Sequence, residues 1–297
     1  MEWTADVSGG DWIRERLDDP DRRPTSMHGF VPRGFPAYAR IFHPGLADDA
    51  AVTWASAAAA FGTQLHSAAQ WDRIVRLNPA ASDAHRATAP DGREYSAPQQ
   101  GRLDAEQLSA TVVHLAAHTE TPDDAFVAVW EGWGGLLGFA ARTPARAALE
   151  MTPADDPDVF ARHAAMLERS IPDPFNNVFR KPVWQSGLLS DEISRGPRLS
   201  LPHRDHVLFR GSIRAFSDPS WAGTVPWAEA EPAWTASPSL IWPADRAWVL
   251  TTEVDADSTI VAGAPDLIRA ICTDPLIEAR AVEEDADLSW DADEVNR

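Results

Sequence analysis

Apolar and polar residues alternate along the chain in patterns that predict both helices and strands. Apolar residues at i, i+4, i+7 and i+8 from Leu108 form one helical face and predict a helix over 104–118. Asp104 is suited to cap the N-terminus of this helix. The apolar run Ala125–Trp130 predicts a strand that is buried on both faces, and Ala37–Phe42 predicts another strand.

Weaker patterns predict the elements between these segments. They are a short helix over 11–17, an alanine-rich helix over 52–65, a helix over 158–169 and a strand over 198–209. Prolines and glycines with few apolar residues predict a loop over 78–102 and little regular structure over 217–243. Helices and strands are therefore interspersed along the chain.

The C-terminal part predicts a unit made of a β-hairpin, a helix and a strand. In chain order these are a strand over 246–254, a turn over 255–257, a strand over 258–262, a helix over 266–273 and a strand over 277–282. Pro265 is suited to the first position of the helix. Residues 283–294 are strongly acidic, and we expect them to be solvated.

Together these elements predict an α+β fold in which a mixed, mainly antiparallel sheet is flanked by helices. The predicted organisation is a polar N-terminal segment over 1–27, one globular domain over 28–282 and an acidic tail over 283–297. The domain can be subdivided near 170–197, where prolines interrupt the pattern.

Charge and composition exclude several classes of partner. The chain of 297 residues carries 45 acidic against 26 basic side chains, a formal net charge of -19, and its only lysine is Lys181. A nucleic acid or an anionic membrane surface needs a basic patch, so we expect neither as a partner. Cys272 is the only cysteine, which excludes an intrachain disulfide. The N-terminus lacks a signal-peptide pattern, so we predict a cytoplasmic location.

One cluster of polar residues has the chemistry of a metal site. His203, Asp205 and His206 lie close in sequence, and His114 lies four residues before His118 on a predicted helix. A strand would place His203 and Asp205 on one face and His206 on the other, so a shared metal needs a bulge or loop. Ion pairs on an edge strand are the favoured interpretation, and a metal-assisted hydrolase is the alternative.

Two further motifs are weaker. The glycine-rich stretch over 132–138 has Leu137 where a dinucleotide-binding loop needs its third glycine. The residues over 255–259 resemble the D-x-D-x-T motif of haloacid dehalogenase-type phosphotransferases, but only 38 residues follow and no lysine comes after Lys181. A hairpin turn explains the same residues. We therefore expect no cofactor.

The 13 tryptophans are the most unusual feature of the composition. Trp130 and Trp133 lie on either side of Glu131, and Trp242 and Trp248 follow later. Indole faces beside carboxylates form sites for sugars or cationic ligands, but tryptophans also pack in cores. These five residues predict a binding surface, in which Glu131 is either the polar anchor or the partner of an arginine.

The leading functional prediction is a non-enzymatic binding or interaction protein whose tryptophan-lined surface takes an unknown protein or small-molecule ligand. Residues 127–134, 238–248 and 252–259 resemble a group of uncharacterised actinobacterial proteins without assigned activity. That resemblance implies a bacterial cytosolic protein and carries no mechanism with it.

Overall fold

The computed structural model describes residues 1–18, 26–77, 86–141 and 183–297. The chain divides into two compact units, one formed by residues 1–132 with 196–297 and the other by 133–195. The predicted helix over 158–169 lies outside the described residues.

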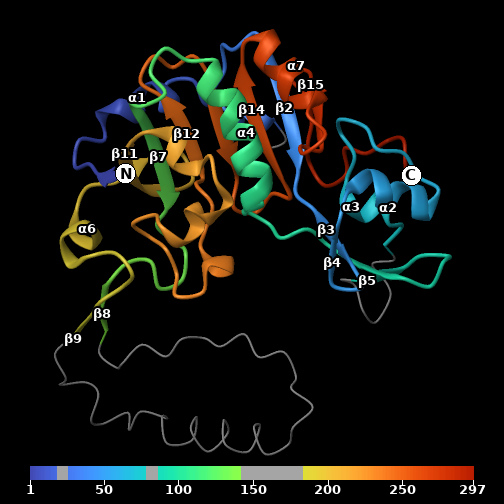
Figure 1. Cartoon of the computed structure of the whole chain (residues 1–297), viewed down its shortest axis with the longest axis horizontal. Coiled ribbons are helices and arrows are strands. Elements are labelled where there is room, and N and C mark those ends of the chain that lie inside the picture. The colour runs from blue at the N-terminus through green and yellow to red at the C-terminus, as the bar shows by residue number, and fades with distance from the viewer. Residues whose placement is uncertain (19–25, 78–85, 142–182) are drawn as a thin grey trace, which may run out of the picture. The chain divides into compact units, whose positions relative to one another are not determined.

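A nine-stranded sheet is the centre of the larger unit (Figure 1). In spatial order its strands are β1 (Glu2–Trp3), β11 (Asp205–Gly211), β7 (Ala125–Trp130), β12 (Leu240–Pro243), β13 (Val249–Thr252), β14 (Ser258–Gly263), β2 (Ala37–Phe42) and β15 (Ala279–Val282), while β10 (Leu199–Ser200) also pairs with β11. All the pairings are antiparallel. The predicted α+β class with a mainly antiparallel sheet is thus confirmed.

Two helices pack against one face of this sheet. Helix α4 (Ala105–Ala117) begins after Asp104, whose carboxylate accepts the N–H groups of Glu106 and Gln107. Its apolar stripe is buried, as the residue spacing predicts. Helix α7 (Pro265–Thr273) buries Leu267 and Ile271 and contacts β2, β14 and β15.

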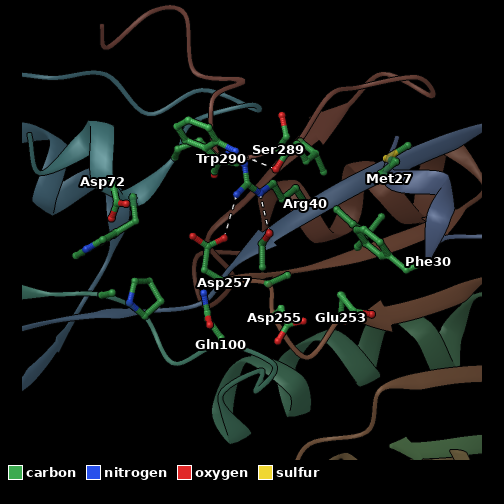
Figure 2. Close-up of a pocket in the computed structure, with 18 of the residues that line it drawn as sticks. Met27, Phe30, Arg40, Asp72, Gln100, Glu253, Asp255, Asp257, Ser289 and Trp290 are labelled. Atoms are coloured by element: carbon green, nitrogen blue, oxygen red, sulfur yellow. Dashed lines mark hydrogen bonds and ion pairs between the residues drawn. The ribbon is translucent and has the colours of Figure 1, made fainter. Parts of the chain in front are cut away.

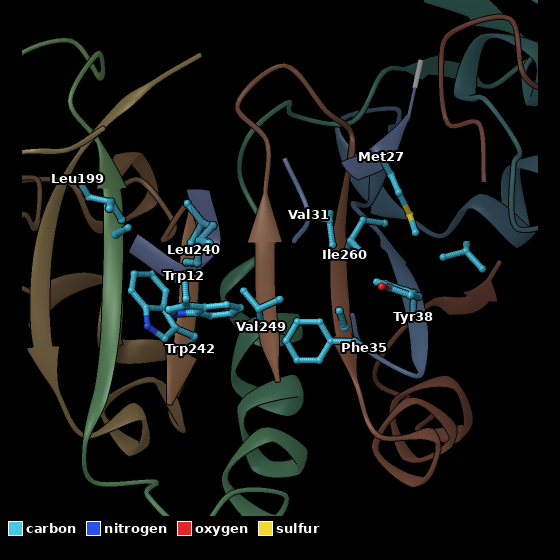
Figure 3. Close-up of a cluster of buried hydrophobic side chains, with 14 of the residues drawn as sticks. Trp12, Met27, Val31, Phe35, Tyr38, Leu199, Leu240, Trp242, Val249 and Ile260 are labelled. Atoms are coloured by element: carbon cyan, nitrogen blue, oxygen red, sulfur yellow. The ribbon is translucent and has the colours of Figure 1, made fainter. Parts of the chain in front are cut away.

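The opposite face is covered by N-terminal segments (Figure 3). These include helix α1 (Asp11–Arg14), the 3-10 turns η1 (Ser8–Gly10) and η2 (Met27–Gly29), and the loop that precedes β2. Trp12 and Phe35 pack edge-on at 6.2 Å, and Trp12 lies at 6.5 Å from Trp242 of β12. A continuous apolar core forms because strand residues alternate between the two faces.

A smaller sheet lies in the same unit, with the strand order β4 (Ala50–Val52), β3 (Gly45–Ala47), β6 (Glu94–Ser96) and β5 (Arg86–Thr88). Helices α2 (Trp54–Phe61) and α3 (Trp71–Ile74) share a buried apolar cluster with it. The predicted loop over 78–102 was therefore wrong in part, because β5 and β6 lie within it. Helix α2 is shorter than predicted, since Thr53 caps its start and Gly62 ends it in a left-handed conformation.

The described elements of the smaller unit are β8 (Phe139–Ala141), which pairs with β9 (Val183–Gln185), and helix α6 (Asp191–Arg195). Three further 3-10 turns belong to the larger unit, namely η3 (Ile213–Phe216), η4 (Pro219–Gly223) and η5 (Pro232–Trp234). Within the described residues, no helix is both long enough and apolar enough to cross a bilayer.

Two further predictions need correction, and one is confirmed. The strand over 198–209 is two strands, β10 and β11, joined by a turn in which Leu201 and Arg204 exchange backbone hydrogen bonds. Pro202 lacks an N–H donor and favours this turn. The C-terminal hairpin, helix and final strand are confirmed, and β15 pairs with β2. The acidic tail is not fully solvated, because Asp293 is 0% exposed.

Candidate functional site

A cavity of about 360 Å³ lies in the larger unit, beside the turn between β13 and β14 (Figure 2). Its lining comes from segments that are distant in sequence, among them η2, the start of α3, residues 97–100, the β13–β14 turn and the C-terminal residues 288–290. A volume of this size falls within the range of roughly 300–1,000 Å³ typical of small-molecule sites.

Four carboxylates line this cavity, namely Asp72, Glu253, Asp255 and Asp257. Among the described residues that line it, the guanidinium of Arg40 lies with them. Arg204 lies just outside the lining and bonds to Glu253 and Asp255, while Arg40 bonds to Asp257. Among the described lining residues, carboxylates therefore outnumber guanidinium groups.

Arg40 is the best-anchored polar group at the site. Its side chain is 1% exposed and donates to Ser258 Oγ at 2.8 Å, to the Ala69 carbonyl at 2.7 Å and to Asp257 Oδ1 at 3.2 Å. The guanidinium carbon also lies 4.8 Å from the centre of the Phe42 ring. Burial lowers the pKa of Arg40, and the charge of Asp257 opposes that shift.

Aromatic and apolar side chains form the rest of the lining. Trp71 is buried in the wall, and Phe30 and Met27 contribute from the N-terminal side. Trp290, by contrast, is 79% exposed. Its segment is held in place by Asp293, whose carboxylate accepts hydrogen bonds from four residues, His66, Gln70, Val295 and Asn296.

A second, smaller cavity of about 30 Å³ shares Phe30 and Glu253 with the first. His206 and Thr251 line it, and both side chains are buried. Burial lowers the pKa of His206 to about 4, so its imidazole is neutral at pH 7.

The predicted anchor Glu131 has an arginine partner. Its carboxylate accepts a hydrogen bond from Arg198 Nε at 2.9 Å, and its side chain is 36% exposed. Neither of the two cavities is lined by Glu131. Trp130 lies beneath the guanidinium of Arg204 at 5.0 Å, whereas Trp133 belongs to the other unit. The structure therefore agrees with the arginine-partner interpretation.

Trp242 and Trp248 do not form a surface, which corrects the sequence-based expectation. Both side chains are 0% exposed. Trp242 stacks on Phe126 with ring centres 5.4 Å apart, and Trp248 Nε1 donates to the Leu115 carbonyl of α4. These two residues are core residues because the sheet is covered on both faces.

The structure does not bring the four residues of the alternative metal site together. His114 Nε2 lies 2.7 Å from Asp274, His203 is exposed in the turn between β10 and β11, and Asp205 begins β11. Within the described residues no three His, Cys, Asp or Glu side chains gather closely enough to hold a metal ion. In the part of the chain that the structure describes, the hydrolase alternative therefore has no assembled metal site.

The 255–259 motif forms the predicted hairpin turn between two antiparallel strands. Two of its carboxylates, Asp255 and Asp257, nevertheless line the cavity, a role that sequence reasoning did not assign to them. Trp71 and Trp290 also line the cavity, and the sequence did not predict a role for either. The available signal for Trp290 is an indole inside a strongly acidic segment, where solvation alone does not explain an aromatic residue.

Comparisons with known proteins identify no relative of this chain. No family model, curated protein or solved structure matches the chain. The resemblance to the actinobacterial group stays a prediction, and so does the binding role of Glu131, Trp130 and Trp133. The larger cavity is the site whose chemistry can be argued further.

Proposed function

We propose that this protein is a non-enzymatic binding protein whose larger cavity takes a small organic cation, such as a quaternary ammonium or a guanidinium group. The observation that supports this most directly is the combination of four lining carboxylates with the exposed indole of Trp290. A cation over an indole face gains about 0.5–2 kcal/mol, and neighbouring carboxylates add Coulomb attraction.

The alternative of an anionic ligand is disfavoured by the state of Arg40. A guanidinium has five N–H donors. Arg40 makes hydrogen bonds to Ser258, to the carbonyls of Ser67 and Ala69, and to Asp257. Its charge is compensated by Asp257 and its donors are largely used, so an incoming anion would meet mainly carboxylates.

The test is isothermal titration calorimetry with choline and with its neutral isostere 3,3-dimethylbutan-1-ol, at low ionic strength and pH 7.5. We expect choline to bind and the neutral alcohol to bind much more weakly, because only choline carries the charge. Raising the salt concentration should weaken choline binding, because salt screens the charge of the carboxylates that line the cavity. Equal binding of both compounds, or binding of neither, would contradict the proposal.

Two variant pairs locate the site. Trp290→Ala should weaken choline binding by about 3- to 30-fold, the range that a cation–π contact implies. Trp234→Ala is its control, because Trp234 is also exposed and does not line the cavity. Asp255→Asn should likewise weaken binding, whereas Asp123→Asn removes an exposed, arginine-paired carboxylate outside the cavity and should not. Equal effects within either pair would place binding elsewhere.

A further inference from the structure

Two residues that line the smaller cavity carry buried polar atoms for which the described residues supply no hydrogen-bond partner. Within the described part of the chain, His206 Nδ1 and Thr251 Oγ1 are buried and have no hydrogen-bond partner. The two side chains are only 4% and 2% exposed. A buried polar atom without a partner costs about 1–3 kcal/mol, so such atoms are rare in native proteins.

The position of these residues explains why protein groups do not reach them. Thr251 lies on β13, opposite Leu240 of β12 and Ile260 of β14, and both of those neighbours are apolar. His206 lies at the start of β11, opposite Trp130 of β7. Both residues contribute to the lining of the same cavity, on the side of the sheet that the N-terminal segments cover.

The chemistry of the two atoms restricts what can satisfy them. The carbonyls of Leu199 and Arg204 lie near the His206 ring, but neither bonds to Nδ1. A neutral imidazole nitrogen either donates or accepts, depending on the tautomer, and a hydroxyl does both. A partner that can itself donate and accept therefore suits both positions.

The volume of the cavity limits which hydrogen-bond partners can fit. The cavity has a volume of about 30 Å³. A water molecule needs roughly 10–15 Å³ of such space together with polar neighbours. The cavity is thus large enough for one or two waters and too small for an organic ligand. Ser239 is a further polar neighbour, because its hydroxyl accepts the Trp130 N–H and keeps its own proton to donate.

We infer that the smaller cavity is a binding site for ordered water molecules, one at His206 Nδ1 and another at Thr251 Oγ1. Each water supplies the hydrogen-bond partner that its atom does not find among the described residues. The inference is independent of the proposed cation site. It bears on that site in one respect, because Thr251 lies two residues before Glu253, which lines both cavities.

Substitutions of the adjacent residues Thr251 and Thr252 test the inference, because a dry cavity and a hydrated cavity predict opposite changes in stability for Thr251→Val. Replacing an unpartnered buried hydroxyl by a methyl group removes only a desolvation cost, so Thr251→Val stabilises a dry cavity. If water is bound, Thr251→Val loses a hydrogen bond and should lower the urea midpoint by about 0.3 M. Thr252→Val is the control for a lost bond, because Thr252 bonds to Thr259 Oγ1 at 2.7 Å.

A crystal structure of the unmodified chain supplies the second measurement. We expect ordered water within hydrogen-bond distance of Thr251 Oγ1 and of His206 Nδ1. An unchanged or raised urea midpoint for Thr251→Val would overturn the inference. Absence of electron density for water at both atoms would overturn it as well, whatever the midpoint of the variant.

Discussion

Acidification to pH 4 should remove several kcal/mol of stability from this protein because of two buried histidines. His43 is 1% exposed and His206 is 4% exposed. Burial lowers the pKa of each from 6.5 to about 4, because the charged imidazolium loses its hydration. Backbone carbonyls near each ring oppose this shift without cancelling it.

The hydrogen bonds of His43 suit a neutral ring. Its Nδ1 lies 3.1 Å from the Gln99 carbonyl, which can only accept, so Nδ1 carries the proton in this arrangement. Its Nε2 lies 2.9 Å from Thr259 Oγ1 and can accept the hydroxyl proton. Thr252 can then donate to Thr259, which completes a buried chain. Protonating His43 at Nε2 would force this chain to reverse.

The magnitude follows from proton linkage. Between pH 6.5 and pH 4 the unfolded chain binds a proton at each of these histidines and the folded chain does not, so stability rises with pH across this window. The stabilisation is complete above pH 6.5 and is lost as the pH falls to about 4. Lowering the pKa of a histidine from 6.5 to about 4 corresponds to about 3 kcal/mol of stability at neutral pH. Two such groups represent a large part of a typical stability of about 5–15 kcal/mol.

The assay is urea unfolding followed by tryptophan fluorescence at pH 7.5, 6.5, 5.5 and 4.5. His43→Gln and His206→Gln should each reduce the dependence of the unfolding free energy on pH by about half, whatever their effect at pH 7.5. His203→Gln is the control, because His203 is exposed. Protonation of surface carboxylates relieves repulsion in a chain of charge -19 and acts in the opposite direction. Unchanged pH dependence in both buried-site variants would refute the reasoning.

Three further substitutions test other parts of the structure. Arg40→Met should lower the free energy of unfolding by about 3 kcal/mol in urea titrations, because it leaves Asp257 and buried carbonyls unpaired, and a loss below 1 kcal/mol would contradict this account. Asp293→Ala should release the C-terminal segment, because the buried carboxylate holds that segment in place. The measurement is amide hydrogen exchange, which should become faster over 287–297. Unchanged exchange would show that other contacts hold the segment. Gly101→Ala should lower the thermal midpoint of unfolding by several degrees. The φ angle of Gly101 is +68°, and the new Cβ would lie 2.5 Å from the Val254 carbonyl oxygen. An unchanged midpoint would show that the backbone relaxes there.

Local patterns were the most reliable guide to the secondary structure. The strands Ala37–Phe42 and Ala125–Trp130 have the predicted bounds, and α4 begins after the predicted cap Asp104. The predicted position of Pro265 at the start of α7 is confirmed too. The strand predicted over 198–209 failed because apolar content alone did not mark the turn at Pro202.

Most of the candidate site could not be predicted from the sequence. Asp255 and Asp257 were recognised as turn residues, but the cavity beside them also needs Trp71 and Trp290 from distant segments. Indole side chains serve a core and a surface equally well, so counting tryptophans did not separate Trp242 from Trp290.

The sequence by itself determined the elements whose signals are local, since caps, prolines and apolar periodicity act within a few residues. It also determined the net negative charge of the chain, to which the proposed cation site appeals. The tertiary structure decided that β2 separates β14 from β15, that Asp293 is buried, and that Arg40 faces Asp257. The physical reason is that strand order and burial depend on how whole apolar faces exclude water together, which no single segment specifies.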